Sequence, residues 1–235
     1  MNEPMSEPEA LRQRYARRAD AALARRYRML DPAVWQSVQE RQRALLRLLA
    51  RVGIDDPAPL RLLEVGCGSG GNLLELLRIG FVPANLCGIE LLPERFAQAR
   101  AVLPAALPLI EGDALAVAVP PASFDIVFVS TVFSSLLDEA FQHRLADAMW
   151  RWTKPGGAVL WYDFTFDNPR NPDVRGVPLA RVRALFPAAL SVEARRVTLA
   201  PPIARAVCRV HPALYTACNA LPLLRTHLLC WIAKA

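Results

Sequence analysis

The segment from residue 62 to residue 73 constrains the fold of this chain more than any other part of the sequence. It reads LLEVGCGSGGNL: an apolar run that contains an acid, then glycines at alternate positions, then the start of a helix-forming run. Alternating glycines let the backbone take positive φ angles and let a ligand approach where a Cβ would block it. A strand, a glycine turn and a helix N-terminus in this order are typical of a nucleotide-type site.

The segments that follow help to decide which kind of nucleotide site this is. A second apolar strand ends in Glu90, and the apolar run 107–110 is followed by Asp113. An acid about 20 residues beyond such a turn can accept both ribose hydroxyls of a nucleoside cofactor. Residues 124–130 and 158–162 then supply a fourth and a fifth strand.

This ordered set resembles the class I S-adenosylmethionine (SAM) dependent methyltransferases, over residues 55–235. Other nucleotide sites fit less well. A Walker phosphate loop needs Lys and then Ser or Thr after its glycines, where this chain has Gly71, Asn72 and Leu73. A dinucleotide fold needs a further glycine to seat a pyrophosphate. The resemblance implies an α/β fold, with a seven-stranded Rossmann-like sheet of order 3-2-1-4-5-7-6 and helices on both faces. It also implies SAM as cofactor and S-adenosylhomocysteine as product.

Hydrophobic periodicity predicts helices in residues 1–55, an N-terminal helical extension, and the resemblance implies a SAM-binding domain over residues 56–235. In the extension, the leucines at 45, 46, 48 and 49 have the character of core residues. The alternation of strands and helices predicts a parallel sheet. Helices are expected at 9–28, 32–52, 71–79, 93–102, 138–153 and 178–186, and the last two strands at 189–199 and 226–233.

Residues 200–225 form an apolar, proline-punctuated segment between the last two strands. Because it leaves the sixth strand at the carboxyl edge, where ligands bind in open α/β sheets, we expect a helical cap over the acceptor pocket. A dimer interface, additional core, contact with a membrane surface and binding of a lipid-like acceptor are the alternatives.

The first predicted helix, 9–28, carries seven arginines against two acids. A solvated helix face explains this pattern most simply. The alternatives are an arm that folds over the cofactor, with Tyr15 or Tyr27 as covering groups, and an element that meets a polyanion.

Composition excludes some classes of protein. Hydrophobic residues make up 53% of the chain and charged residues 21%, which argues against disorder. The net charge of +6 is compatible with anionic substrates, nucleic acid or an acidic membrane surface, and does not choose among them. Five cysteines without a Cys-x-x-Cys pair, and three scattered histidines, predict free thiols and no metal site.

The sequence also bears on location. The N-terminus lacks the apolar core of a signal peptide, and the longest uncharged stretch, 210–224, is shorter than the ~20 residues that span a bilayer. We therefore expect a cytoplasmic protein, either a monomer or a homodimer.

The resemblance assigns cofactor roles to matching positions of this chain. The glycines would lie against the methionyl moiety, with Glu64 orienting the turn. Glu90 would hold the ribose, and Asp113 would accept from the adenine amino group. Ser130 would face the methionyl end beside the acceptor. The expected cofactor-binding residues are Glu64, Gly66, Cys67, Gly68, Gly70, Glu90, Leu91, Asp113, Ala114 and Ser130.

The acceptor side has fewer sequence signals. Asp163, at the end of the fifth strand, and His211, in the predicted cap, are candidate general bases for a hydroxyl acceptor. Each also has a structural interpretation without a catalytic role. Asp163 can cap the loop that follows it, and His211 can be a histidine whose hydrogen bonds are satisfied within the cap. Arg170 and Arg175 are candidates for clamping an anionic acceptor, and Phe133 for lining its pocket.

The end of the fourth strand lacks the Asn/Asp-Pro-Pro-aromatic motif of enzymes that methylate base nitrogens, and the chain has no Pro-Cys pair. Residues 163–176 resemble a subset of these enzymes associated with bacterial glycan and natural-product gene clusters. We therefore expect O-methylation of a small molecule or a saccharide. The rival hypotheses are an RNA methyltransferase that uses the basic N-terminal helix, and a non-catalytic SAM-binding scaffold subunit.

Overall fold

The protein is built around one seven-stranded mixed sheet, seen in the computed structural model, which describes residues 5–17, 28–168 and 171–235. The strand order is β3-β2-β1-β4-β5-β7-β6, as predicted. Neighbouring strands among β1 to β5 pair in parallel, and β7 is antiparallel to both β5 and β6. The strands are β1 (Leu62–Val65), β2 (Leu86–Glu90), β3 (Leu109–Glu111), β4 (Phe124–Ser130), β5 (Thr153–Phe164), β6 (Ser191–Leu199) and β7 (Arg225–Ala233).

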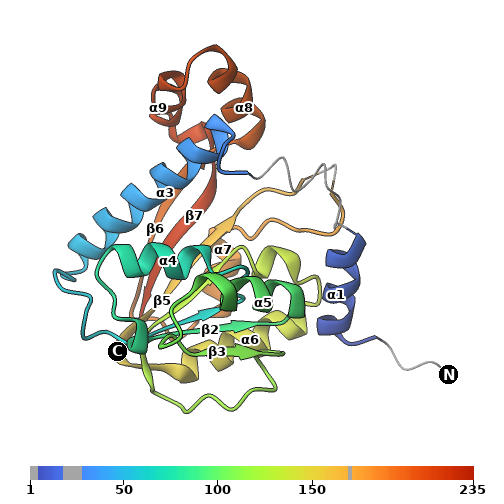
Figure 1. The fold of residues 1–235 in the computed structure, drawn as a ribbon, viewed down its shortest axis with the longest axis vertical. Helices are drawn as coiled ribbons and strands as arrows, with labels where there is room; N and C mark the ends of the chain where they lie inside the picture. Colours follow the sequence, from blue (N-terminus) through green and yellow to red (C-terminus); the bar gives the residue numbers. More distant parts are fainter. Residues whose placement is uncertain (1–4, 18–27, 169–170) are drawn as a thin grey trace.

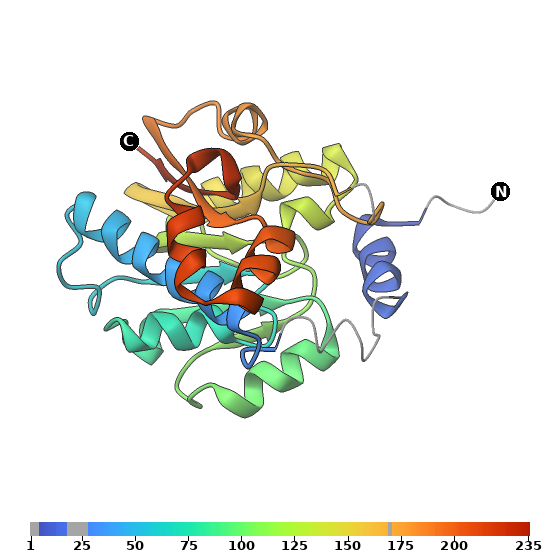
Figure 2. The ribbon, with the colours of Figure 1, turned by 90° about the horizontal axis from the view of Figure 1, so that it is seen from above.

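Helices cover both faces of the sheet (Figure 1; Figure 2). The α-helices are α1 (Glu7–Arg17), α3 (Pro32–Arg51), α4 (Gly71–Arg78), α5 (Pro93–Val102), α6 (Glu139–Trp152), α7 (Leu179–Leu185), α8 (Pro201–Val210) and α9 (Ala213–Asn219). Short 3₁₀ helices are η1 (Pro83–Asn85), η2 (Phe133–Ser135) and η3 (Pro222–Leu224). Because side chains alternate along a strand, Leu63 of β1 packs in the same core cluster as residues of α6 and α7, while Leu62 packs with residues of α3, α4 and α5.

The helix boundaries follow from local sequence signals. Asp31 caps α3 by accepting from the Ala33 amide at 2.8 Å, with Pro32 as first helical residue. Within α3, Leu45, Leu48 and Leu49 are buried, but Leu46 is 48% exposed. The expectation that Leu46 belongs to the core is therefore wrong, because the three buried leucines occupy the i, i+3 and i+4 positions of one helix face.

The first predicted helix is seen as α1, and residues 18–27 of that prediction lie outside the described residues. The fifth strand, expected at 158–162, begins earlier, so that residues 154–157 are part of β5. The pairing register with β4 shifts between Phe124 and Ile126, so the extra residues are accommodated as an irregularity of the strand. The division of the chain at residue 55 stays a prediction.

Helices α8 and α9 form the insertion between β6 and β7. Its inner face packs Ala204, Cys208 and Tyr215 against Leu199 of β6 and Ala33 of α3. The Tyr215 hydroxyl accepts from the Leu199 amide at 3.2 Å. In the part of the chain that the structure describes, no helix has the length and apolar character needed to cross a bilayer.

His227 of β7 makes the stability of the fold depend on pH. Its ring stacks on Tyr162 with centroids 5.0 Å apart. Burial, aided by the positive charge of Arg41, lowers its pKa from 6.5 to about 4. The unfolded chain therefore binds this proton more strongly, so stability present above pH 6.5 is lost as the pH falls toward 4.

We expect His227→Gln to remove this loss. Between the two pKa values, the free energy of unfolding of the wild type should fall by up to about 3 kcal/mol relative to the variant. Urea titrations across that pH range measure the difference, and His143→Gln, at an exposed position, is the control. Parallel pH profiles for the wild type and His227→Gln would mean that the folded protein protonates His227 freely.

Candidate functional site

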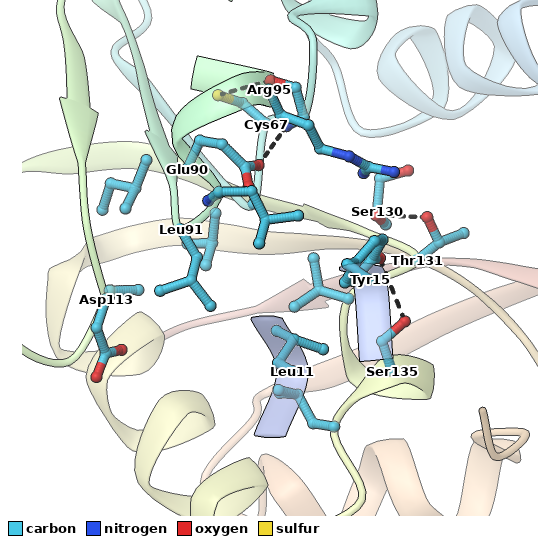
Figure 3. Close-up of a pocket in the computed structure, with 18 of the residues that line it drawn as sticks. Leu11, Tyr15, Cys67, Glu90, Leu91, Arg95, Asp113, Ser130, Thr131 and Ser135 are labelled. Atoms are coloured by element: carbon cyan, nitrogen blue, oxygen red, sulfur yellow. Dashed lines mark hydrogen bonds between the residues drawn. The ribbon is translucent and has the colours of Figure 1, made fainter. Parts of the chain in front are cut away.

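A cavity of about 410 Å³ opens at the carboxyl ends of β1, β2 and β4 (Figure 3). Its walls are the glycine turn, the ends of β2 and β4, the beginning of α5, and α1. The described residues that line it include Pro8, Leu11, Tyr15, Arg41, Gly66, Cys67, Gly68, Glu90, Leu91, Arg95, Asp113, Ala114, Ser130, Thr131, Ser135 and Leu136. The volume lies within the range of about 300–1,000 Å³ that is usual for small-molecule sites.

The glycine turn is held against the end of β2. The amides of Gly66 and Cys67 both donate to the Ile89 carbonyl, at 2.8 and 3.0 Å. Gly66 has φ +69°, and a Cβ there would lie 2.6 Å from Val132. Gly68 has φ +58° and lines the cavity. At position 66 only glycine allows both the positive φ angle and the close approach of Val132.

Glu90 links the turn to the second strand. Its carboxylate accepts from the Gly68 amide at 2.7 Å and from the Leu92 amide at 2.9 Å. The side chain is 5% exposed and lines the cavity. A carboxylate has about four acceptor positions, so these two bonds leave capacity for ligand hydroxyls.

Glu64 lies beneath the turn and not in the cavity wall. It is fully buried, and its Oε1 accepts from the Asn72 side-chain amide at 2.6 Å. Burial raises the pKa of Glu64 to about 8, against the lowering effects of the Asn72 bond and the charge of Arg41. Glu64 therefore ties β1 to the start of α4. Gly70, the N-cap of α4, packs against Leu103 and is likewise not among the lining residues.

The other predicted cofactor residues lie around the same cavity. Leu91, Asp113 and Ala114 line it beyond the ends of β2 and β3. Asp113 accepts from the Leu115 amide at 3.0 Å. Ser130 lines it at the end of β4, next to Thr131, which has φ +54°. Cys67 is also in the wall, and burial raises the pKa of its thiol well above the usual range, which keeps it protonated.

Helix α1 covers the side of the cavity that faces away from the glycine turn. The sequence allows an arm over the cofactor as an alternative to a solvated helix in this segment. Leu11 and Tyr15 line the cavity, and the Tyr15 hydroxyl lies 3.5 Å from Ser135 Oγ (Figure 3). The Arg95 guanidinium stacks over the Tyr15 ring, 4.5 Å from its centroid. The other covering group that the sequence suggested, Tyr27, is outside the described residues.

A buried ion pair attaches α1 to the loop after β4. Arg14 Nη2 donates to Glu7 Oε1 at 2.5 Å and to the Ser135 carbonyl at 3.0 Å. Glu7 Oε1 also accepts from the Leu137 amide at 2.7 Å. Both side chains are more than nine-tenths buried. These interactions, called the α1 latch below, join residues far apart in the sequence, which is why sequence periodicity did not reveal them.

The structure does not bring all the predicted acceptor residues to the cavity. Asp163 is 1% exposed and accepts from the amides of Ser134 and Phe164, at 3.0 and 2.9 Å. Burial raises the pKa of Asp163 to about 6, and the bonds from Ser134 and Phe164 oppose that rise. Asp163 thus holds the η2 turn in place. Phe133 is buried in the core, with its ring 4.6 Å from Trp161.

The remaining candidates lie elsewhere. His211 is exposed on the α8–α9 insertion, where its ring accepts from the Ala213 amide at 3.2 Å. No described residue of 200–225 lines the cavity, so the structure gives the expected cap no support. Arg175 forms an exposed ion pair with Glu139. Arg170 lies outside the described residues. The roles predicted for His211, the 200–225 cap, Arg175 and Arg170 stay predictions.

Comparisons with known proteins agree with this geometry. A family model described as "Methyltransferase domain" matches residues 63–161. The trans-aconitate 2-methyltransferase of Acidovorax ebreus (strain TPSY) is 34% identical over 191 residues, covering 77% of this chain and 69% of the relative. The enzyme of the same name from Azoarcus sp. (strain BH72) is 33% identical over 164 residues, covering 67% of this chain and 62% of the relative.

Solved structures share the fold. Phosphoethanolamine N-methyltransferase 2 of Haemonchus contortus, in complex with SAM, has a TM-score of 0.59 at 16% identity, covering 81% of this chain and 52% of that one. The fold, the glycine turn and the acid at the end of β2 define a nucleoside-cofactor enzyme of the Rossmann-like type. The chain belongs to the class I SAM-dependent methyltransferases.

The residues present fit SAM. Gly68 leaves the cavity wall open where a Cβ would project, and Glu90 and Asp113 offer acceptors for ribose and adenine donors. The turn carries no lysine, in keeping with a cofactor that has no phosphate.

Replacing Glu90 tests the cofactor half of the site. We expect Glu90→Ala to weaken SAM binding by about 1.5–3 kcal/mol, because hydrogen bonds to a charged group are lost. Titration calorimetry measures the change, with Glu111→Ala, exposed at the end of β3, as control. If Glu90→Ala binds SAM as tightly as the wild type, Glu90 does not hold the ribose.

Breaking the α1 latch should loosen α1 without unfolding the sheet. Arg14→Met leaves Glu7 without its partner, and α1 can then detach so that Glu7 is hydrated. We expect faster hydrogen exchange in residues 7–17 and 135–137, with an unchanged rate in β4 and β5. Arg12→Met, at an exposed position of the same helix, is the control. Equal exchange in both variants would mean that the latch does not hold the helix.

Proposed function

We propose that this methyltransferase transfers the methyl group of SAM to an oxygen atom of a small anionic acceptor. The observation that carries the proposal is the position of Arg95. Its side chain extends across the cavity toward Ser130, close to Tyr15 of α1 (Figure 3). The guanidinium stacks on Tyr15 and has no ion pair with any described residue. No described acid therefore competes with a bound carboxylate for this guanidinium.

The seated α1 favours a small acceptor. With the α1 latch closed, Leu11 and Tyr15 form one wall of a cavity of about 410 Å³, which SAM and the acceptor must share. The buried side of α1 faces the molecule through Arg14, so this arginine is not available to contact a polyanion. Both features favour a small molecule over RNA.

The charges in the cavity favour an acceptor that is already ionised. The charged residues among the described lining are Arg41, Arg95, Glu90 and Asp113. Both acids lie at the ends of β2 and β3, in the predicted ribose and adenine positions. A carboxylate acceptor presents an ionised oxygen at neutral pH and needs no protein base. A saccharide hydroxyl would need one, and Asp163 and His211 would have to move to supply it.

The relatives named trans-aconitate 2-methyltransferase support this choice, since trans-aconitate is a tricarboxylic acid. The matched regions do not span the full length of these relatives. The acceptor of this chain is therefore a proposal and is not taken over from the relatives' names.

The chain's own residues would bind, align and enclose the reactants. SAM, when bound, supplies an activated methyl group on a sulfonium. Glu90 and the turn amides would orient the cofactor, and Arg95 would orient the acceptor carboxylate. Leu11, Tyr15 and Leu136 would exclude water from the cavity. Alignment and enclosure are the main demands of an in-line displacement on carbon.

The test is a methyl-transfer assay with labelled SAM and a panel of small di- and tricarboxylic acids, including trans-aconitate, alongside neutral saccharides. We expect methyl ester products from one or more acids. Arg95→Gln should raise KM for the acid by about 10- to 100-fold, through loss of a charge-assisted bond, with SAM affinity unchanged. Arg47→Gln, at an exposed position of α3, is the control.

The other outcomes of this assay would contradict the proposal or support another function. Transfer to a saccharide alone would contradict the anionic acceptor. Transfer to RNA, with steep salt dependence, would support the RNA hypothesis. SAM binding without transfer to any acceptor would support a scaffold role.

A further inference from the structure

The outer surface of the α8–α9 insertion has an unusual composition. Four of its large apolar side chains are exposed to solvent, although none belongs to the cavity. These are Val210 (78% exposed), Leu214 (39%), Leu221 (57%) and Leu223 (87%), called the outer apolar side chains below. Single exposed leucines are ordinary, but several on one short segment indicate an interaction surface.

The outer apolar side chains are not a poorly packed core. The inner face of the insertion already has its partners, with Tyr215 fully buried and Ala204 and Cys208 packed against Leu199. The apolar side chains of the insertion thus form two sets: one is packed against β6 and α3, and the other is exposed to solvent.

The charge of the insertion has a single sign. From Ala200 to Leu224 the sequence contains Arg205 and Arg209 and no Asp or Glu. Arg209 is exposed at the end of α8, beside Val210. The partner that this surface fits is therefore both apolar and negatively charged.

The insertion is also in a position to reach such a partner. It forms one end of the molecule, beyond the carboxyl end of β6 and next to the beginning of α3 (Figure 1; Figure 2). A flat surface can approach it without meeting the helices that cover the sheet around the cavity.

We propose that the α8–α9 insertion docks this protein on the surface of a bilayer that contains anionic lipids. The outer apolar side chains would enter the boundary between headgroups and acyl chains, and Arg209 would lie at the level of the lipid phosphates. A second copy of this chain is a poorer occupant, because a two-fold interface would place the same cationic surface against itself.

The experiment is co-sedimentation of the full chain with large unilamellar vesicles of phosphatidylcholine, with and without phosphatidylglycerol. The variant Leu221→Ser/Leu223→Ser removes apolar contact, and Arg209→Gln removes charge. Matched controls are Leu190→Ser, 71% exposed before the amino end of β6, and Arg151→Gln, at an exposed position of α6. Titration calorimetry with SAM verifies that each variant is folded, since none of these residues lines the cavity.

We expect the wild type and both controls to sediment with the anionic vesicles and to stay in solution with phosphatidylcholine alone. The double serine variant should bind the anionic vesicles about tenfold less, because the burial of apolar surface is lost. Arg209→Gln should bind less and show weaker salt dependence.

Three results would overturn the proposal. They are a wild type that stays in solution with both kinds of vesicle, binding that the double serine variant retains in full, and a wild type that light scattering shows to be a dimer while the double serine variant is a monomer. The last would assign the surface to a second copy of the chain.

Discussion

The hydrogen bonds between the glycine turn and the end of β2 are the interaction on which the rest of the site depends. The amides of Gly66 and Cys67 donate to Ile89, and the Gly68 amide donates to Glu90. Together they bring the loop after β1 across the end of β2 and direct the Glu90 carboxylate to the cavity. Position 66 must be glycine, because a Cβ there would lie 2.6 Å from Val132 in the loop after β4.

The α1 latch adds a second constraint, of a different kind. A buried ion pair between Arg14 and Glu7 carries a large desolvation cost, which further hydrogen bonds to Ser135 and Leu137 offset. Such a pair contributes little net stability, but it specifies one position for the helix. In that position α1 adds a wall to the cavity at the carboxyl ends of the strands.

Local signals predicted the parts of the site that are continuous in sequence. The apolar runs predicted the strands, and the alternating glycines predicted the turn between Val65 and α4. The placement of Glu90 followed because the strand and its terminal acid are adjacent in the chain. The predictions were weaker where a residue's partner comes from another element. Asp163 had the appearance of a strand-end base, yet its oxygen accepts from Ser134, which follows a different strand. Arg95 carries no sequence signal, because its contact with Tyr15 joins residues far apart in the chain.

The sequence by itself determined the class of fold and the position of the glycine turn and of Glu90, because hydrophobic periodicity and glycine conformation act over a few neighbouring residues. Only the tertiary structure decided that α1 covers the cavity while the α8–α9 insertion lies away from it. The sequence left more than one interpretation open for each of these two segments. What separates them is a few long-range contacts: Arg14 with the loop after β4, and Tyr215 with Leu199. Such contacts depend on where the sheet places its loops, and that placement is a property of the folded chain.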